Sequence, residues 1–378
     1  MEEIVSKITG VSDLDWSELA ELSGMEIHPD QLRKMGAGIR LAYEAGMLGA
    51  DAVLPKDTSA HEMQKLRDLR REINEAYRAE ARSEALREAV IQAAGQLTPI
   101  EFRPMQPIEE GGKRSLLLAV GDMHYGAEWA VKGLMGETIN AYSPEVFERR
   151  METLLAETLS ILRREGLSHV DLMMCGDAMD GMLRNSQLMK LRWGVVESCM
   201  RLSEYLANWI GRLSEFASVR VMNVDGNHSE IRPLGSRKGE FPNENMEKIM
   251  AWYLHARLGG HTNVTVDPES TTMKLVEIQG KNVLVAHGDT VKGLDTLAKQ
   301  AMLLYGKRID YCICAHKHRE QEAVSGYTDD GNTLVLRVPS VCGMDGFAQR
   351  LGYGGKAGAL CLVMEEGYGR RCMYPIAL

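Results

Sequence analysis

Five short polar clusters, each placed where an apolar, β-rich run ends, constrain the fold of this chain more than any other feature. Their polar residues are Asp122 and His124, Asp177 and Asp180, Asn227 and His228, His287, and His316 with His318. Residues at the carboxyl ends of strands line the edge where open α/β sheets bind ligands. The spacing therefore predicts an α/β fold in which the five clusters build one site.

The side chains in these clusters are those of a site for two metal ions. Imidazole and carboxylate ligands without cysteine suit borderline divalent ions such as manganese, iron or zinc. A bridging carboxylate can hold two such ions about 3.5–4 Å apart, and the pair generates hydroxide near neutral pH and clamps phosphoryl oxygens. The clusters thus predict hydrolysis of phosphoesters.

In order and in kind, the clusters resemble the calcineurin-like metallophosphoesterase superfamily, whose pattern runs D-x-H, GD-x-x-D, GNH, H and GH-x-H. The match covers residues 115–320. The resemblance implies an α/β four-layer sandwich, with two central mixed β-sheets flanked by helices. Here an N-terminal helical extension precedes that fold.

The resemblance also implies a role for each residue of the clusters. One metal ion would be held by Asp122, His124, Asp177 and His318, and the second by Asp177, Asn227, His287 and His316, with Asp177 as the bridge. His228 would protonate the leaving oxygen, Asp180 would orient that imidazole, and Asn227 would help to stabilise the added charge. We expect two divalent ions, with manganese favoured and iron or zinc as alternatives.

Departures from the family pattern favour phosphodiesters. Gly181 stands where protein phosphatases carry an arginine that grips a phosphomonoester, and His124-Tyr125-Gly126 is closer to the repair-nuclease branch. Ser229 replaces the usual acidic residue after GNH, and Ala315 replaces a glycine, so a positive φ there would be strained.

Four polar residues near the clusters are candidate substrate contacts: Arg184, Asn185, Arg232 and Arg237. They would contact the substrate backbone. The alternative is that they belong to ordinary solvated loops.

We expect a metal-dependent phosphodiesterase that acts as a DNA nuclease, similar to the catalytic subunit of double-strand-break repair exonucleases. The added N-terminal module also looks like that of phage- or prophage-encoded phosphoesterases. One alternative is a phosphodiesterase or phosphatase for small molecules such as cyclic nucleotides. Another is a DNA-binding or multimerising scaffold with secondary activity, against which the intact ligand set argues.

Composition sets broader limits. The chain has 378 residues, a net charge of −9 and 44% hydrophobic residues, which allows a sizeable core but argues against a broadly basic nucleic-acid-binding surface. Seven cysteines without a CxxC pair are expected to be reduced and mostly buried. The first residues lack a signal-peptide pattern and no long apolar run occurs, so we expect a cytoplasmic protein.

Three regions are expected along the chain. Residues 1–55 predict a helix-turn-helix-like module, in which Asp15 caps a first helix, Pro29 opens a second, and Arg33, Lys34 and Arg40 could contact DNA phosphates. With 10 acidic and 4 basic residues, this module fits packing or homodimer formation better. Residues 56–113 predict a long charged helix over 60–95, either a coiled-coil arm or a docked helix, and a linker.

Residues 114–378 predict the catalytic domain, with alternating strands and helices. Strands are expected over 115–120, 170–175, 219–224, 272–278, 282–286, 311–314, 333–338 and 360–364, and helices over 144–165, 187–216 and 243–258.

Overall fold

The computed structural model describes residues 14–22, 28–44, 60–100, 112–181, 183, 185–232, 244–290, 293–328, 331–352 and 355–378. The chain divides into two compact units, Met1–Arg78 (unit 1) and Ala79–Leu378 (unit 2). The division falls inside helix α4 (Ala60–Gly95), and the expected boundaries at residues 55 and 113 stay predictions. None of the described helices is both long and apolar enough to cross a membrane.

Unit 1 contains two short helices whose contact depends on a glycine. Helix α2 (Trp16–Leu22) begins at Asp15, whose carboxylate accepts hydrogen bonds from the Ser17 and Glu18 N–H groups at 2.7 and 2.9 Å, which confirms the predicted cap. Helix α3 (Pro29–Glu44) packs against it. A Cβ at Gly36 would overlap the Trp16 ring, so this glycine, which weakens the helix, permits the contact between the helices.

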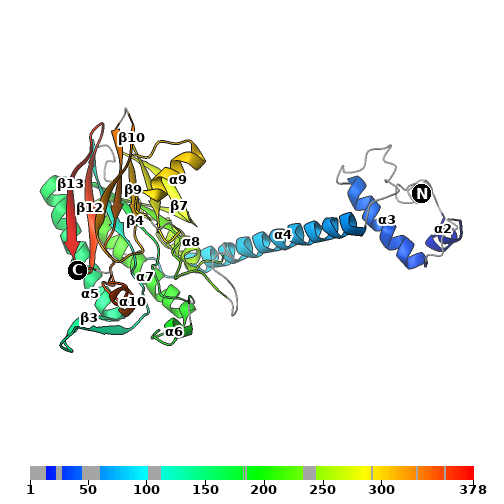
Figure 1. Cartoon of the computed structure of the whole chain (residues 1–378), viewed down its shortest axis with the longest axis horizontal. Coiled ribbons are helices and arrows are strands. Elements are labelled where there is room, and N and C mark those ends of the chain that lie inside the picture. Colours follow the sequence, from blue (N-terminus) through cyan, green and yellow to red (C-terminus); the bar gives the residue numbers. More distant parts are fainter. Residues whose placement is uncertain are drawn as a thin grey trace. The chain divides into compact units, whose positions relative to one another are not determined.

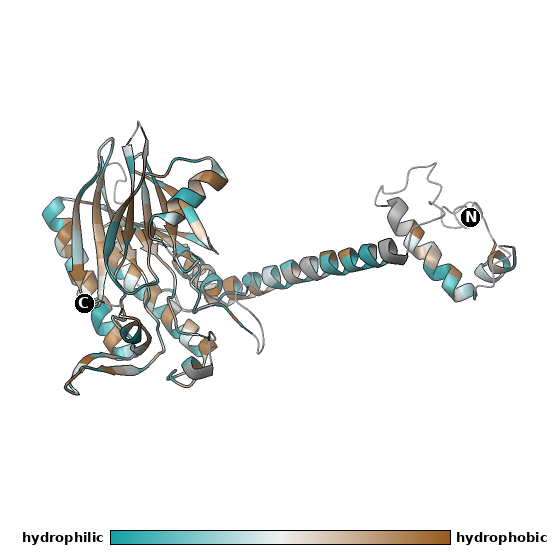
Figure 2. Ribbon diagram, viewed as in Figure 1, coloured by the Kyte–Doolittle hydropathy of each residue, from teal (hydrophilic) through white to brown (hydrophobic). Residues whose placement is uncertain are grey.

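Helix α4 follows the predicted range of residues 60–95 and is mostly hydrophilic (Figure 2). Its apolar side chains Leu69, Ile73 and Tyr77 are exposed. The structure does not test the coiled-coil arm, homodimer formation or DNA contact.

Unit 2 is built on two mixed sheets (Figure 1). The six-stranded sheet has the order β13 (Gly369–Ala377), β12 (Gly358–Glu365), β1 (Arg114–Val120), β4 (His169–Met174), β5 (Ser218–Val224) and β6 (Val264–Thr271). The five-stranded sheet has the order β10 (Gln321–Thr328), β11 (Gly331–Arg337), β9 (Tyr311–Cys314), β8 (Lys281–Ala286) and β7 (Met273–Ile278). Strands β1, β4, β5 and β6 are parallel, as are β8, β9 and β11, and the remaining pairings are antiparallel.

Helices cover the outer face of each sheet and complete four layers. Helices α5 (Pro144–Glu165), α7 (Val195–Ser214) and α8 (Met246–Leu258) cover the six-stranded sheet, and α9 (Thr296–Tyr305) covers the other. Because side chains alternate along a strand, Leu116 and Leu118 of β1 face the helices while Leu117 and Ala119 face the second sheet. This arrangement confirms the predicted α/β sandwich.

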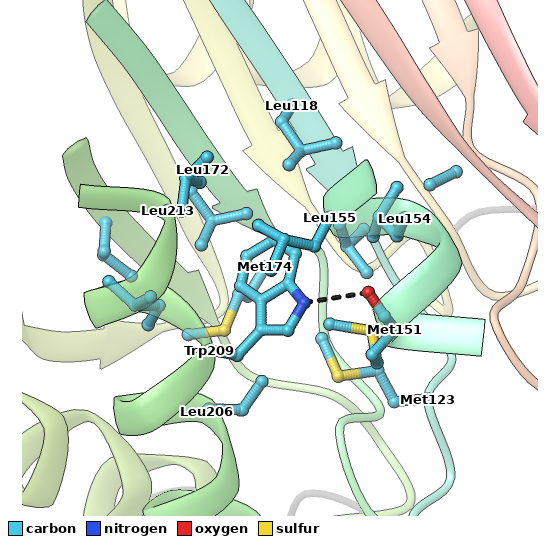
Figure 3. Close-up of a cluster of buried hydrophobic side chains, with 14 of the residues drawn as sticks. Leu118, Met123, Met151, Leu154, Leu155, Leu172, Met174, Leu206, Trp209 and Leu213 are labelled. Carbon is cyan, nitrogen blue, oxygen red and sulfur yellow. Dashed lines mark hydrogen bonds between the residues drawn. The ribbon is translucent and has the colours of Figure 1, made fainter. Parts of the chain in front are cut away.

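The core beneath the helices is centred on Trp209 of α7. Its Nε1 donates a hydrogen bond of 2.9 Å to the Met151 carbonyl of α5, and Leu206 and Leu213 lie beside it (Figure 3). An indole can be buried this deeply because its one polar atom is satisfied. The contact fixes α7 against α5 over the sheet.

Several elements differ from the expectations. The predicted helix over 187–216 is two helices, α6 (Asn185–Leu188) and α7, because Gly194 has an extended backbone and begins α7. The sequence did not predict the hairpin of β2 (Trp129–Lys132) and β3 (Thr138–Tyr142) or the short helix α10 (Gly346–Arg350). It also did not predict α9, β6, β10 and β13. Strand β6 contains Pro268, which a strand tolerates at the edge of a sheet.

Replacing Leu206 by Ala should lower the free energy of unfolding of unit 2 by about 2–5 kcal/mol, because a buried leucine leaves a cavity. The measurement is urea denaturation followed by circular dichroism. Met200→Ala removes a long apolar side chain from the same helix, but one that is 63% exposed, and should change the value by less than about 0.5 kcal/mol. Equal effects of the two variants would contradict the core described above.

Candidate metal centre

The five clusters lie at the carboxyl ends of five parallel strands. Asp122 follows β1, Asp177 follows β4, Asn227 follows β5, His287 follows β8 and His316 follows β9. Three strands belong to one sheet and two to the other. The two sheets are joined at this end, where the Val341 and Cys342 N–H groups donate to the carbonyls of Gly121 and Asp122.

The backbone is strained at most of the expected ligands. In the described chain, six non-glycine residues have a positive φ, and five of them are expected ligands: Asp122, His124, Asp177, His316 and His318. Such left-handed conformations cost about 1–3 kcal/mol each and cluster at functional sites. Ala315, where the family has glycine, is not among the six residues, so that substitution adds no strain of this kind.

The first group of donor atoms matches the first expected metal site. His124 Nε2 lies 3.2 Å from His318 Nε2, and Asp122 Oδ1 lies 4.0 and 3.7 Å from these two nitrogens. Asp177 Oδ2 lies 3.9 Å from His124 Nε2. Asp122 Oδ1 is buried and has no hydrogen-bond partner among the described residues. A buried, unpaired carboxylate oxygen is costly unless a cation neutralises it.

The second group surrounds His287 Nε2. This nitrogen lies 3.0 Å from Asp177 Oδ2, 3.1 Å from Asn227 Oδ1 and 3.1 Å from His316 Nδ1. Donor atoms bound at about 2.0–2.2 Å from one ion lie about 3–3.5 Å apart, so the spacing fits a divalent ion. Asp177 Oδ2 is shared by both groups, as the predicted bridge requires.

Groups behind these ligands orient them. The Cys175 carbonyl lies 3.0 Å from His287 Nδ1 and so fixes Nε2 as the nitrogen that faces Asp177. Cys342 Sγ lies 3.8 Å from His318 Nδ1, the ring nitrogen that does not face Asp122. Burial lowers the pKa of His287, but the Asp177 carboxylate outweighs this and raises it to about 10. The ion-free site thus carries a proton that a metal ion would displace.

His228 lies beside the two groups, where it is held by two aspartates. Its Nδ1 lies 2.6 Å from Asp180 Oδ1, and its backbone N–H donates to Asp177 Oδ1 at 2.7 Å. Burial raises the pKa of Asp180, but hydrogen bonds from His124 and His228 lower it more, so the carboxyl is ionised. The terminal amide of Gln187 also lies 3.1 Å from His228 Nδ1, a contact that the sequence did not predict.

Two glycines permit the close approach of the loops. A Cβ at Gly226 would overlap the backbone nitrogen and carboxylate of Asp177, and a Cβ at Gly176, whose φ is +84°, would lie 2.8 Å from His287 Nδ1. Gly181, at the position of the phosphatase arginine, leaves no room for a side chain because a Cβ would overlap the His228 carbonyl oxygen.

Of the four expected substrate contacts, only the side chain of Arg232 lies within the described residues. Arg232 is paired with Glu230 at 2.6 Å, and it does not line the cavity beside the metal centre. Arg184, Arg237 and the side chain of Asn185 lie outside the described residues. Their contacts with substrate stay predictions.

Glu247 is a positioning residue that sequence reasoning missed. Its fully buried carboxylate accepts hydrogen bonds from the Ala178 N–H at 2.7 Å, the Gly226 N–H at 2.6 Å and the Ser229 hydroxyl at 2.9 Å. It therefore ties the loop of Asp177 to the loop of Asn227. Where the family has an acidic residue after GNH, this chain has Ser229, and Glu247 of α8 supplies a carboxylate at this place instead. An acidic residue in the first turn of a helix is common, so only the missing acid at residue 229 could have signalled this role.

A cavity of about 350 Å³ opens beside the metal centre. Its lining includes His124, His228 and His318, together with side chains from β2, the region of α6, and α10. This volume lies within the range of small-molecule sites.

Gly226→Ala should abolish metal binding, because the added Cβ displaces the Asp177 loop. Titration calorimetry with Mn²⁺ measures the loss. Gly260→Ala, where a Cβ meets nothing within 4 Å, should bind as the natural protein does. Normal Mn²⁺ binding by the Gly226 variant would rule out the close contact of these loops.

Glu247→Ala should weaken Mn²⁺ binding by about 10- to 100-fold, because two buried N–H groups lose their acceptor and the loops separate. Glu247→Gln, which keeps one acceptor oxygen, should recover part of the affinity. Glu244→Gln, an exposed change close to α8, is the control. Unchanged affinity in Glu247→Ala at a preserved fold would refute the positioning role.

Comparisons with known proteins add the following. No family model matches the chain. The SPbeta prophage-derived uncharacterized protein YonJ of Bacillus subtilis is 29% identical over 333 residues, which cover 86% of this chain and 80% of the relative. An archaeal phosphodiesterase and a dimetal phosphatase from Danio rerio are each 12% identical with a TM-score of 0.33, covering 70% of this chain and 99% and 98% of theirs. Because these sequence identities and TM-scores are low, the chemistry of the site is inferred from its own side chains.

Proposed function

We propose that the chain is a metal-dependent phosphodiesterase of the calcineurin-like metallophosphoesterase superfamily. The observation that carries the proposal is the position of Asp177 Oδ2, which is shared by two separate groups of nitrogen and oxygen donors. The order of the five clusters along the chain agrees with that family. The ligand assignments made from the sequence fall into the same two groups.

The donor set would hold two divalent ions, which when bound would supply a nucleophile at neutral pH and neutralise charge on the phosphoryl oxygens. His228 then acts on the leaving group. Because its Nδ1 is bonded to Asp180, its Nε2 is the nitrogen that can pass a proton to the departing oxygen. Asp180 holds the ring in place, while the Asn227 amide adds to the polarity around the phosphoryl group.

A diester fits this site better than a monoester. A phosphomonoester dianion needs a strong bidentate cation, and the position of the phosphatase arginine is Gly181, where no side chain fits. Of the cations that line the cavity, Lys317 lies between two expected ligands in the chain, whereas Lys190 and Arg350 come from other segments. Lys190 and Arg350 suit a substrate that has groups beyond the phosphoryl centre.

DNA is the proposed substrate polymer, as the resemblance to repair nucleases implies, and the prophage-derived relative supports a phage association for this chain. The cavity of about 350 Å³ favours a second candidate, hydrolysis of a small nucleotide-type phosphodiester. The proposal has three further parts: manganese as the ion, DNA contact by unit 1, and homodimer formation through the N-terminal helices.

The test compares hydrolysis of bis-p-nitrophenyl phosphate and p-nitrophenyl phosphate by the full chain with Mn²⁺. The diester should be cleaved faster, and chelation should remove both activities. Asp177→Ala and His228→Ala should each lower kcat for the diester by at least about 100-fold. His255→Ala, which removes an imidazole bonded to the Val266 carbonyl, should retain activity. Activity that survives in Asp177→Ala would overturn the proposal.

A further inference from the structure

The part of the cavity lining that lies outside the five clusters, here called the wall, has features that the phosphoester chemistry does not use. It is formed by three short elements: Trp129 from β2, Gln187 and Lys190 from α6 and the turn after it, and Phe347 and Arg350 from α10. None of these residues belongs to the five clusters. Their side chains combine flat aromatic, hydrogen-bonding and cationic groups.

Phe347 presents an aromatic ring that is 49% exposed at this wall. The helix that carries it is fixed in position. Asp345 Oδ1 accepts a hydrogen bond from the Ala348 N–H at 2.7 Å, and the Gln349 amide donates to the Lys132 carbonyl of β2 at 2.8 Å. A rigid, half-exposed ring beside a phosphoester site is suited to stacking on a flat ring of the substrate.

The charge of the wall suits an anionic ligand. Outside the five clusters, the cavity lining holds two cations, Lys190 and Arg350, and one carboxylate, Asp345, although the whole chain carries a net charge of −9. Arg350 lies 6.0 Å from the centre of the Phe347 ring, so a positive charge accompanies the aromatic face. Aromatic faces with adjacent cations are how proteins hold unstacked nucleotides.

We propose that this wall is a subsite for a single unstacked nucleotide, with Phe347 stacking on the base beside the Arg350 guanidinium. The inference rests on the proposed function and names its substrate class: a nucleotide phosphodiester presented as a mononucleotide ester, a strand end or a short single strand. A base inside a duplex is stacked on both faces and cannot take this position without being extruded.

The experiment compares two diesters with the same leaving group, thymidine 5′-monophosphate p-nitrophenyl ester and methyl p-nitrophenyl phosphate, with the Mn²⁺-loaded full chain. The natural protein should prefer the nucleotide ester in kcat/KM by at least about tenfold. Phe347→Ala should remove most of this preference, lowering it by about fivefold or more, while leaving the methyl ester within about twofold. Phe216→Ala, which removes a ring of similar exposure far from the cavity lining, is the control.

The outcomes separate the two proposals. If neither ester is hydrolysed, the proposed function fails, and the subsite is decided by calorimetric binding of thymidine 5′-monophosphate, which Phe347→Ala should weaken to the same extent. Hydrolysis of both esters without a preference would overturn the subsite alone. An equal loss for both esters in Phe347→Ala would also overturn it, since that result indicates a general structural effect.

Discussion

The contact between the Asp177 loop and the Gly226 loop is the constraint on which the rest of the site depends. One carboxylate can serve two groups of ligands only if the loops after β4 and β5 approach until no side chain fits between them. The backbone of the first loop reaches this arrangement with Asp177 in a left-handed conformation, which costs about 1–3 kcal/mol. Glu247 offsets part of that cost, because it accepts hydrogen bonds from one N–H group of each loop.

The sequence predicted the parts of this structure that follow from strand ends. Asp122, Asp177 and Asn227 could be placed together because each ends a buried parallel strand, and the four-layer fold followed from the resemblance that these residues carry. Glu247 and Phe347 could not be found in this way. Their roles come from tertiary contacts between segments far apart in the chain, and locally they resemble an ordinary first-turn acid and an ordinary loop aromatic.

The two parts of the cavity lining are built from different kinds of structure. The metal ligands are fixed by strands of two sheets, whereas the wall consists of parts of a hairpin, a four-residue helix and a five-residue helix. Sequence patterns predicted none of these short elements as such, since they bury few apolar residues and have no clear periodicity. The metal ligands could therefore be proposed from the sequence, whereas the residues of the wall could not.

The layer between the sheets has a consequence for the metal centre. Asp122, Asp177 and Asn227 are carried by one sheet and His287, His316 and His318 by the other, so the thickness of the packing between the sheets sets the distance between the two halves of the site. Cys175 and Ala315 are small residues of that layer, and Ala315 lies against Gly121. Interior packing resists a change of even one methylene group. The innermost, chemically inert side chains thus act as a spacer that sets the distance between the ligands that the two sheets would contribute to each metal site.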